Sequence, residues 1–210
     1  MLKILESVTT KSGNKIELIG TQETGKVLII GVFHGDEPQG KYLIEKYLKQ
    51  ENTAKHLFIP CLNPDGMQAN SRTNANGVDL NRNFPTQNWG QDTSQAGDNP
   101  ANYYSGTSAA SEIETQFVVN IIEKYQPKLI LTLHAPYKIV NYDGSAEDIA
   151  QQISEIINYP VEASIGYPTP GSFGTYCGVE RNIPTITLEL DEEIPVEKLV
   201  QPVFEIFDNL

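Results

Sequence analysis

The chain has 210 residues, 39% of them hydrophobic, and a formal net charge of −12. This length suits one ordinary domain with a sizeable core, so we expect a single domain over residues 1–210. The acidic balance argues against nonspecific nucleic-acid binding. The absence of an apolar run of roughly 20 residues, together with a polar N-terminus, favours a cytoplasmic protein without a membrane partner.

Short apolar runs alternate with helix-like patterns along the chain. Residues 26–33 form a continuous, β-branched run, which predicts a strand buried on both faces. Asp36 and Pro38 then indicate the start of a helix. The remaining patterns predict, in chain order, a strand at 55–61, a helix capped by Ser108 or Ser111, a strand at 129–133, a helix at 146–157, a strand at 184–190 and a helix at 196–207.

This alternation predicts an α/β layer fold with a largely parallel sheet. The segment 62–107 does not fit the alternation, because it is rich in Asn, Gly, Pro and Ser and has no clear period. A connection of this length inside a compact domain is usually functional or disordered. Its sequence is not of low complexity, and this favours a function.

Two histidines follow predicted strands and form a candidate metal site. His34 comes directly after the strand at 26–33, with Glu37 three residues later, and His134 follows the strand at 129–133. Imidazole and carboxylate groups both suit zinc, and catalytic zinc usually has three protein ligands. In open sheets ligands bind beyond the carboxyl ends of strands. A lone His is more often structural, so spacing alone leaves both interpretations open, and we expect His56 to be an ordinary half-exposed side chain.

The segment after the next strand carries the more specific signal. Asn63-Pro64-Asp65-Gly66 is followed by Arg72 and then by the sequence NANGVDLNRNFP at residues 74–85. With His34 and Glu37 in front of it, this series resembles the zinc carboxypeptidase family. The resemblance implies a three-layer α/β/α fold with a mixed, largely parallel sheet. It covers most of the chain from Gly31 to Glu189.

Within that family the resemblance runs furthest toward bacterial murein peptide amidases. It continues through residues 88–89, 166–174 and 187–189. It implies a zinc-dependent hydrolase that cleaves an amide bond next to a free carboxylate. The substrate implied is a small peptide carrying γ-D-glutamyl-meso-diaminopimelate, in the recycling of peptidoglycan.

The resemblance also implies a role for each site residue. His34, Glu37 and His134 would bind one Zn²⁺ per chain, and Asp79 would hydrogen-bond a ligand imidazole and fix its tautomer. A turn residue is the alternative for Asp79. Glu189 matches the catalytic glutamate, which takes a proton from water and returns it to the leaving amine. The plain alternative for Glu189 is a polar edge of a strand.

Three further positions match substrate contacts of the family. Arg72 corresponds to the arginine that stabilises the oxyanion. Asn81 and Arg82 correspond to the pair that binds the terminal carboxylate, for which the planar fork of arginine is suited. Tyr167 is the candidate for a catalytic, substrate-capping tyrosine, with Tyr176 as its competitor.

Some features of the sequence leave the specificity open. The residue that sets side-chain preference in digestive carboxypeptidases has no clear equivalent, although Gly174 lies near its place in the motif. Cleavage of ordinary peptides and deacylation of N-acyl amino acids are alternative hydrolase functions. A noncatalytic peptide-binding module is the alternative from another class.

Overall fold

A computed structural model describes residues 2–22, 26–50, 56–91, 100–163 and 166–210, and its centre is a mixed sheet of eight strands. The strand order is β1-β2-β4-β3-β5-β8-β6-β7. The strands are β1 (Lys3–Thr9), β2 (Lys15–Gly20), β3 (Val27–Gly31), β4 (Leu57–Ile59), β5 (Leu129–His134), β6 (Ile139–Asp143), β7 (Val161–Glu162) and β8 (Thr185–Glu189).

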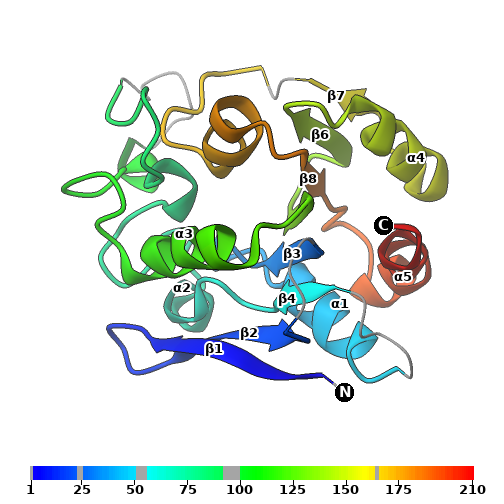
Figure 1. The fold of residues 1–210 in the computed structure, drawn as a ribbon, viewed down its shortest axis with the longest axis horizontal. Coiled ribbons are helices and arrows are strands. Elements are labelled where there is room, and N and C mark those ends of the chain that lie inside the picture. The colour runs from blue at the N-terminus through cyan, green and yellow to red at the C-terminus, as the bar shows by residue number, and fades with distance from the viewer. Residues whose placement is uncertain (1, 23–25, 51–55, 92–99, 164–165) are drawn as a thin grey trace.

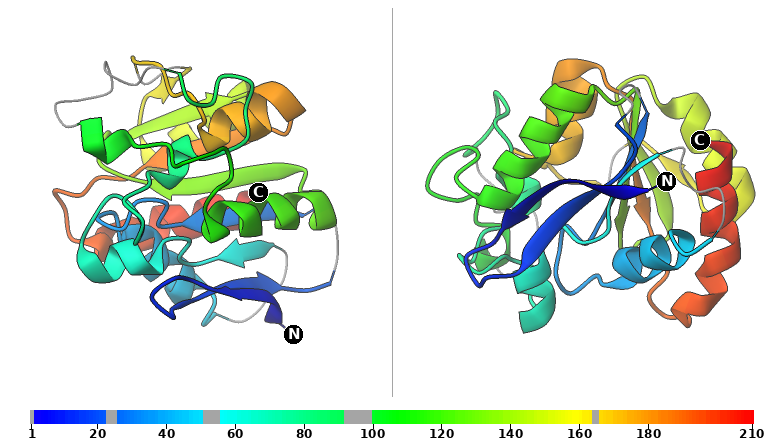
Figure 2. Two further views of the ribbon diagram at one scale, coloured as in Figure 1. Left: turned by 90° about the vertical axis from the view of Figure 1, so that its left-hand side faces the viewer. Right: turned by 60° about the horizontal axis from the view of Figure 1, so that its bottom comes forward.

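Helices cover the sheet on both faces (Figures 1 and 2). α3 lies on one side with the short helix η3, and α1, α4 and α5 lie on the other. The α-helices are α1 (Gln39–Tyr47), α2 (Pro64–Ala69), α3 (Ile113–Tyr125), α4 (Glu147–Ile157) and α5 (Val200–Asn209). The short helices are η1 (Leu80–Arg82), η2 (Pro100–Tyr103), η3 (Thr175–Val179) and η4 (Val196–Leu199).

The central strands are buried on both faces because alternate side chains enter two different cores. Val27 and Ile29 of β3 pack in the core under α1, α4 and α5. Leu28 and Ile30, one position along, pack in the core under α3. A continuous apolar run is therefore what such a strand requires. The three-layer α/β/α fold with a mixed, largely parallel sheet is confirmed.

Most expected elements are present in the structure. The strands expected at 26–33, 129–133 and 184–190 are β3, β5 and β8, which pair in parallel as neighbours. The expected helix at 146–157 is α4, and that at 196–207 is η4 followed by α5. Lys55, at the start of the strand expected at 55–61, lies outside the described residues.

Two expectations from the sequence are wrong. The N-cap of α3 is Glu112 and not a serine, because the Ser111 hydroxyl donates to the Glu112 carboxylate at 2.6 Å instead of capping the backbone. His56 is only 3% exposed, and its Nε2 lies 2.8 Å from the carbonyl oxygen of Phe207. Its contact with α5 comes from distant chain packing, which local sequence does not encode.

The parallel core strands bring the candidate residues to one edge of the sheet. β3, β5 and β8 run in the same direction, so their carboxyl ends meet. His134 and Glu189 are direct register partners at the ends of β5 and β8. The site is therefore a product of the sheet topology.

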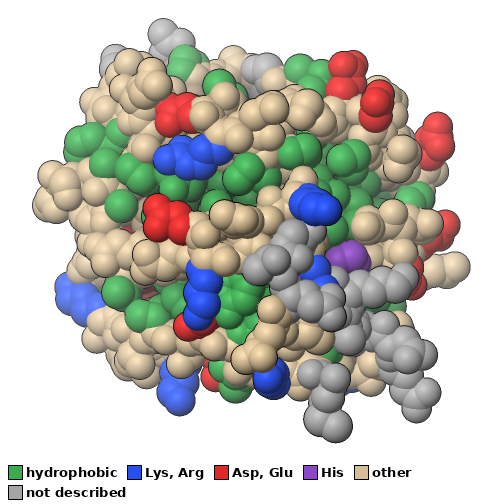
Figure 3. Space-filling view, in the orientation of Figure 1, with side chains coloured by type: hydrophobic (Ala, Val, Ile, Leu, Met, Phe, Trp, Pro, Cys, Tyr) green, Lys and Arg blue, Asp and Glu red, His purple; other side chains and the backbone are tan. Residues whose placement is uncertain are grey.

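On the face drawn in Figure 3, the basic and acidic side chains of the described residues are scattered among hydrophobic and other groups. None of the helices in the described ranges combines the length and the apolar character that crossing a membrane requires.

Candidate metal centre and active-site pocket

The chain turns sharply where β3 ends, and this turn presents the first two candidate ligands. Val32 has a φ of 57°, a left-handed conformation that β-branched residues rarely adopt and that costs on the order of 1–3 kcal/mol. Gly35 then lies directly against α2, since a Cβ there would come within 2.0 Å of the Gly66 carbonyl carbon. Only glycine permits this approach, which fixes the loop bearing His34 and Glu37.

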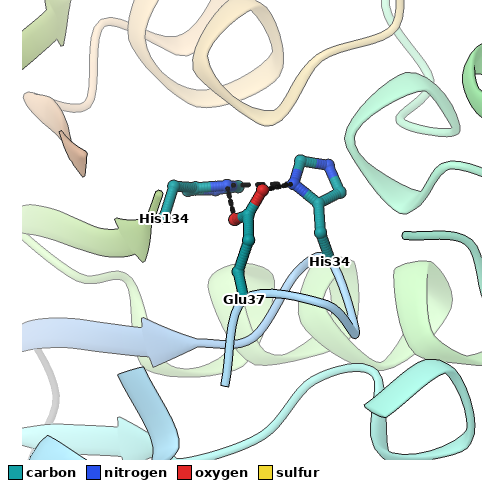
Figure 4. Close-up of side chains that lie close together, drawn as sticks. All are labelled: His34, Glu37 and His134. Atoms are coloured by element: carbon teal, nitrogen blue, oxygen red, sulfur yellow. Dashed lines mark hydrogen bonds and ion pairs between the residues drawn. The ribbon is translucent and has the colours of Figure 1, made fainter. Parts of the chain in front are cut away.

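His34, Glu37 and His134 converge at this edge (Figure 4). The Nδ1 atom of His34 lies 2.8 Å from Oε1 of Glu37, and Nδ1 of His134 lies 3.1 Å from Oε2. The two Nδ1 atoms are 3.3 Å apart, and the candidate ligand atoms all lie within 4.8 Å of one another. Residues separated by about 100 positions in the chain thus form one compact group.

Asp79 determines which ring nitrogen of His34 carries the proton and which one faces this group. It is fully buried, and its Oδ1 lies 3.1 Å from Nε2 of His34. Because a carboxylate only accepts hydrogen bonds, a neutral His34 carries its proton on Nε2 and keeps the Nδ1 lone pair facing Glu37. Two imidazoles and one carboxylate held in this way match the donor set of a catalytic zinc site. The residues present therefore fit a zinc ion.

The charges of the group are strongly coupled. Burial lowers the pKa of His34, but the carboxylates of Glu37 and Asp79 raise it by more, to about 9. Burial raises the pKa of Glu37, yet His34 and His134 hold that pKa well below its usual range. Arg72 and His34 do the same for the pKa of Asp79. The carboxylates are therefore ionised and attract positive charge to this place.

The group forms one wall of a pocket of about 330 Å³. Glu189 lies in the same pocket, 6% exposed, and its Oε2 is buried without a hydrogen-bond partner among the described residues. Burial raises the pKa of Glu189, and the nearby Glu37 raises it further against the effect of the two histidines. A raised pKa moves a carboxylate toward the range in which it exchanges protons near neutral pH.

Arg72 lies beside the group of three candidate ligands and is held by Asp79. Its Nε and Nη2 atoms donate to Oδ2 of Asp79 at 3.2 and 3.0 Å, and Nη1 lies 3.8 Å from Oε1 of Glu37. The guanidinium also stacks 5.1 Å from the centre of the Tyr103 ring. Asp79 thus holds the Nε–Nη2 edge of the Arg72 guanidinium, and the side chain remains part of the pocket wall.

Asn81 and Arg82 follow Asp79 on η1 and face the same pocket. Oδ1 of Asn81 accepts from the backbone N–H of Phe173 at 2.8 Å, which leaves its amide NH₂ as a donor. Arg82 is 1% exposed, its Nη1 donates to the Asn81 carbonyl, and its buried Nε has no partner among the described residues. Both side chains therefore retain donors for an anionic ligand.

Asparagine side chains hold together residues 63–83, the part of the long segment after β4 that carries the site. Asn63 caps α2, and its amide donates to the carbonyls of Phe33 and Arg72 at 3.2 and 3.3 Å. Asn74 accepts from two backbone N–H groups of its own turn and donates to Glu112. These bonds replace the regular ladders that the segment lacks. The asparagines of this segment thus hold the backbone that carries the site residues.

The two competing tyrosines have different environments. Tyr167 lies in the pocket wall, where burial, followed by Tyr137, raises its pKa to about 12. Tyr176 is 1% exposed, packs 5.5 Å from Phe84 and carries Arg181 over its ring at 3.5 Å. Of these two tyrosines, only Tyr167 lines the pocket and can reach a ligand there.

Three residues near the site were missed from the sequence. Tyr103 contacts both arginines, at 5.1 Å from Arg72 and 5.7 Å from Arg82. Tyr137 and Asp143 lie in or beside the pocket on the segment that follows β5. No sequence motif identifies any of them, because their positions depend on how the segments that carry them fold back onto the site.

Comparisons with known proteins agree with this geometry. The family model described as zinc carboxypeptidase matches residues 3–156. Murein peptide amidase A of Escherichia coli K12 is 34% identical over 177 residues, covering 80% of this chain and 72% of the relative. The enzyme of the same name from Vibrio campbellii is 34% identical over 188 residues, 84% of this chain and 75% of the relative.

Solved structures show the same fold. The murein-tripeptide amidase of Escherichia coli O157 superposes with a TM-score of 0.82 at 28% identity, over 99% of this chain and 90% of that one. Carboxypeptidase A of Helicoverpa armigera has a TM-score of 0.74 at 18% identity, over 98% and 66% of the two chains, and supports the fold alone. The present chain is a hydrolase that belongs to the zinc carboxypeptidase family.

Proposed function

We propose that this protein is a zinc-dependent amidase that cleaves the γ-D-glutamyl-meso-diaminopimelate bond of small murein peptides. The observation that carries the proposal is the convergence of His34, Glu37 and His134 next to the buried, unpartnered carboxylate of Glu189. The similarity to enzymes named murein peptide amidase supports the choice of substrate. A cytoplasmic location and a part in peptidoglycan recycling belong to the same proposal.

His34, Glu37 and His134 would hold the zinc ion. A zinc ion bound there supplies a Lewis acid for the substrate carbonyl and lowers the pKa of a bound water toward about 7. The amide NH₂ of Asn81 and the guanidinium of Arg82 bind the free carboxylate of the substrate. This contact places the adjacent amide bond between Arg72 and Glu189 in the same pocket.

Glu189 moves the proton. Its carboxylate takes a proton from the attacking water as the water oxygen bonds to the carbonyl carbon. Arg72 donates to the carbonyl oxygen, on which negative charge develops. Glu189 then gives the proton to the amine nitrogen as the carbon–nitrogen bond breaks, which releases the amino acid and regenerates the carboxylate. Tyr167, which also lines the pocket, covers the bound substrate.

Product analysis tests this proposal. The zinc-loaded protein is incubated with L-Ala-γ-D-Glu-meso-diaminopimelate, with ordinary C-terminal peptides and with N-succinylglutamate, each with and without a chelator. We expect free diaminopimelate and L-Ala-D-Glu, formed fastest and only without the chelator. Faster release from the ordinary peptides or from N-succinylglutamate would reject the amidase in favour of another hydrolase of the same chemistry. Tight binding of the tripeptide without turnover would indicate a binding module.

A further inference from the structure

The two arginines that line the active-site pocket differ in how their charges are balanced. Arg72 donates two hydrogen bonds to the carboxylate of Asp79, at 3.2 and 3.0 Å. Arg82 is 1% exposed, and its Nη1 donates to the carbonyl oxygen of Asn81 at 2.7 Å. Its buried Nε has no hydrogen-bond partner among the described residues. A buried cation is costly where no anion is bonded to it, so the remaining contacts of Arg82 decide where its guanidinium lies.

The ring of Tyr103 lies against both guanidinium groups. Its centre is 5.1 Å from Cζ of Arg72 and 5.7 Å from Cζ of Arg82. The face of an aromatic ring attracts a cation within about 6 Å, and the attraction is strongest where water is excluded. One ring thus helps to hold two like charges in the same pocket wall. Its contribution is largest for Arg82, which lacks the bonded carboxylate that Arg72 has.

The backbone that follows Tyr103 is bonded to the segment that carries Arg82. The carbonyl oxygen of Tyr104 accepts from the backbone N–H of Asp79 at 2.9 Å. The next carbonyl, that of Ser105, accepts from the side-chain amide of Asn83 at 2.8 Å. These bonds join the two chain segments on both sides of η1, so the Tyr103 ring and the arginine that it contacts are held in one rigid arrangement.

We propose that Tyr103 is a positioning residue, whose ring holds the Arg82 guanidinium in the orientation that binds the free carboxylate of the substrate. The inference rests on the proposed function in one respect, the binding of that carboxylate by Asn81 and Arg82. Arg72 has a second restraint in Asp79, so loss of the ring displaces Arg82 and leaves Arg72 largely in place. The ring therefore acts on the affinity for the carboxylate more than on the rate of turnover.

Binding of L-norleucine tests this inference without any turnover, because this amino acid has a free carboxylate and no amide bond. Its dissociation constant is measured by NMR titration of the zinc-loaded protein. Tyr103→Leu removes the aromatic face and should raise the dissociation constant by about 3- to 30-fold, as the loss of a desolvated cation–π contact implies. Tyr103→Phe keeps the ring and should stay within about twofold of the wild type.

A matched control and a double-mutant cycle assign the effect to the contact with Arg82. Tyr42→Leu removes a tyrosine ring that lies 5.2 Å from Nζ of Lys46 on α1, and it should leave the affinity unchanged. In an Arg82→Gln background, Tyr103→Leu should change the dissociation constant by less than about twofold. Thermal unfolding curves check each variant, and Tyr103→Met takes the place of a leucine variant that unfolds. Wild-type affinity without the ring, an equal loss in Tyr103→Phe, or a full effect in the Arg82→Gln background would overturn the inference.

Kinetics with L-Ala-γ-D-Glu-meso-diaminopimelate separates this inference from the proposed function. We expect Tyr103→Leu to raise KM by about 3- to 30-fold and to keep kcat within about threefold of the wild type. A loss of kcat with unchanged norleucine affinity would place the effect of the ring on Arg72 and contradict the assignment to Arg82. If no γ-glutamyl peptide is cleaved while norleucine binding still depends on the ring, the amidase proposal fails and the role of Tyr103 stands. Cleavage with wild-type KM in Tyr103→Leu would keep the amidase and remove that role.

Discussion

The two halves of the active-site region differ in how their charged groups are satisfied. On the metal side, Asp79 contacts His34, Arg72 and the backbone N–H of Asn81, and Glu37 contacts both histidines. The cavity side is a smaller adjoining cavity of about 120 Å³, which Asn141, Asp143 and Thr187 help to line. There, the Asp143 carboxylate has no hydrogen-bond or ion-pair partner among the described residues. In the first half, the charged groups already satisfy one another, as a proposed metal site requires. The second half leaves an unmet interaction, which a ligand can supply.

This difference shows which charged groups of the site are stabilised by contacts within the chain and which carboxylate is left without such a contact. Mutually bonded groups hold the geometry of the reacting centre before substrate arrives, which is what electrostatic catalysis requires. An unpartnered carboxylate lowers stability and is retained where function needs it. The predictions below test each half separately, beginning with the largest expected effect.

The largest effect is expected from Glu189→Gln on the metal side. The variant cannot take or return a proton, so kcat should fall by about 10²- to 10⁴-fold. Because Glu189 is outside the group of three candidate ligands, the zinc content should stay at one per chain. Single-turnover rates and elemental analysis of the same sample measure both quantities. Wild-type turnover by the zinc-loaded variant would remove Glu189 from the mechanism.

Arg72→Gln should lower kcat by about 10²- to 10³-fold, with a smaller change in KM, because the oxyanion loses its charged donor. Arg72 also bonds to Asp79, so a thermal unfolding curve is needed to show that the variant remains folded. Arg181→Gln, which removes a guanidinium from the stack over Tyr176, is the matched control and should keep kcat. A KM effect without a kcat effect would place Arg72 in ground-state binding only.

Asp79→Asn should weaken zinc binding by about 10- to 100-fold. The new amide can turn its NH₂ toward Nε2 of His34, and the imidazole proton is then displaced to Nδ1, the atom that faces Glu37. Competition with a chromophoric chelator measures the zinc affinity. Asp65→Asn is a suitable control, since Asp65 is a buried aspartate that binds Thr10 and Asn14 away from the metal group. Equal zinc affinity in both variants would contradict the tautomer argument.

The smallest effect concerns the stability of the cavity side. Burial raises the pKa of Asp143 above the value it has in the unfolded chain. The folded state therefore binds the proton more tightly, and the free energy of unfolding falls as pH rises through that interval. Asp143→Asn should accordingly unfold at a higher urea concentration than the wild type near pH 7. The difference should shrink below about pH 4, where the wild-type carboxyl is protonated in both states. A variant that is less stable at neutral pH would show that Asp143 already has a stabilising partner.

The residues of the metal side could be predicted from the sequence, because they lie at strand ends and within one dense motif. His34 and His134 follow short apolar runs that favour buried strands, and β3 and β5 are indeed parallel neighbours. Asp79, Asn81 and Arg82 stand close together in the chain, so a single short helix places all three. The roles assigned to these residues remain predictions that the variants test.

The cavity side could not be read in the same way. Asp143 reaches the site because β6 pairs antiparallel with β8, a contact between segments more than 40 residues apart that no local pattern indicates. Gly174 lies near the specificity position of the motif, but the side chain that it faces, Asp143, approaches from another strand. The burial of His56 is not predictable from the local sequence for a similar reason, since it depends on α5 at the far end of the chain. Side-chain environments set by distant packing need the fold.

The most direct test of the account is anomalous X-ray diffraction at the zinc edge from crystals of the protein grown with zinc. We predict one anomalous peak per chain, bonded by the side chains of His34, Glu37 and His134 and adjacent to Glu189. A peak elsewhere, or none at these three residues in zinc-loaded and active protein, would contradict the account.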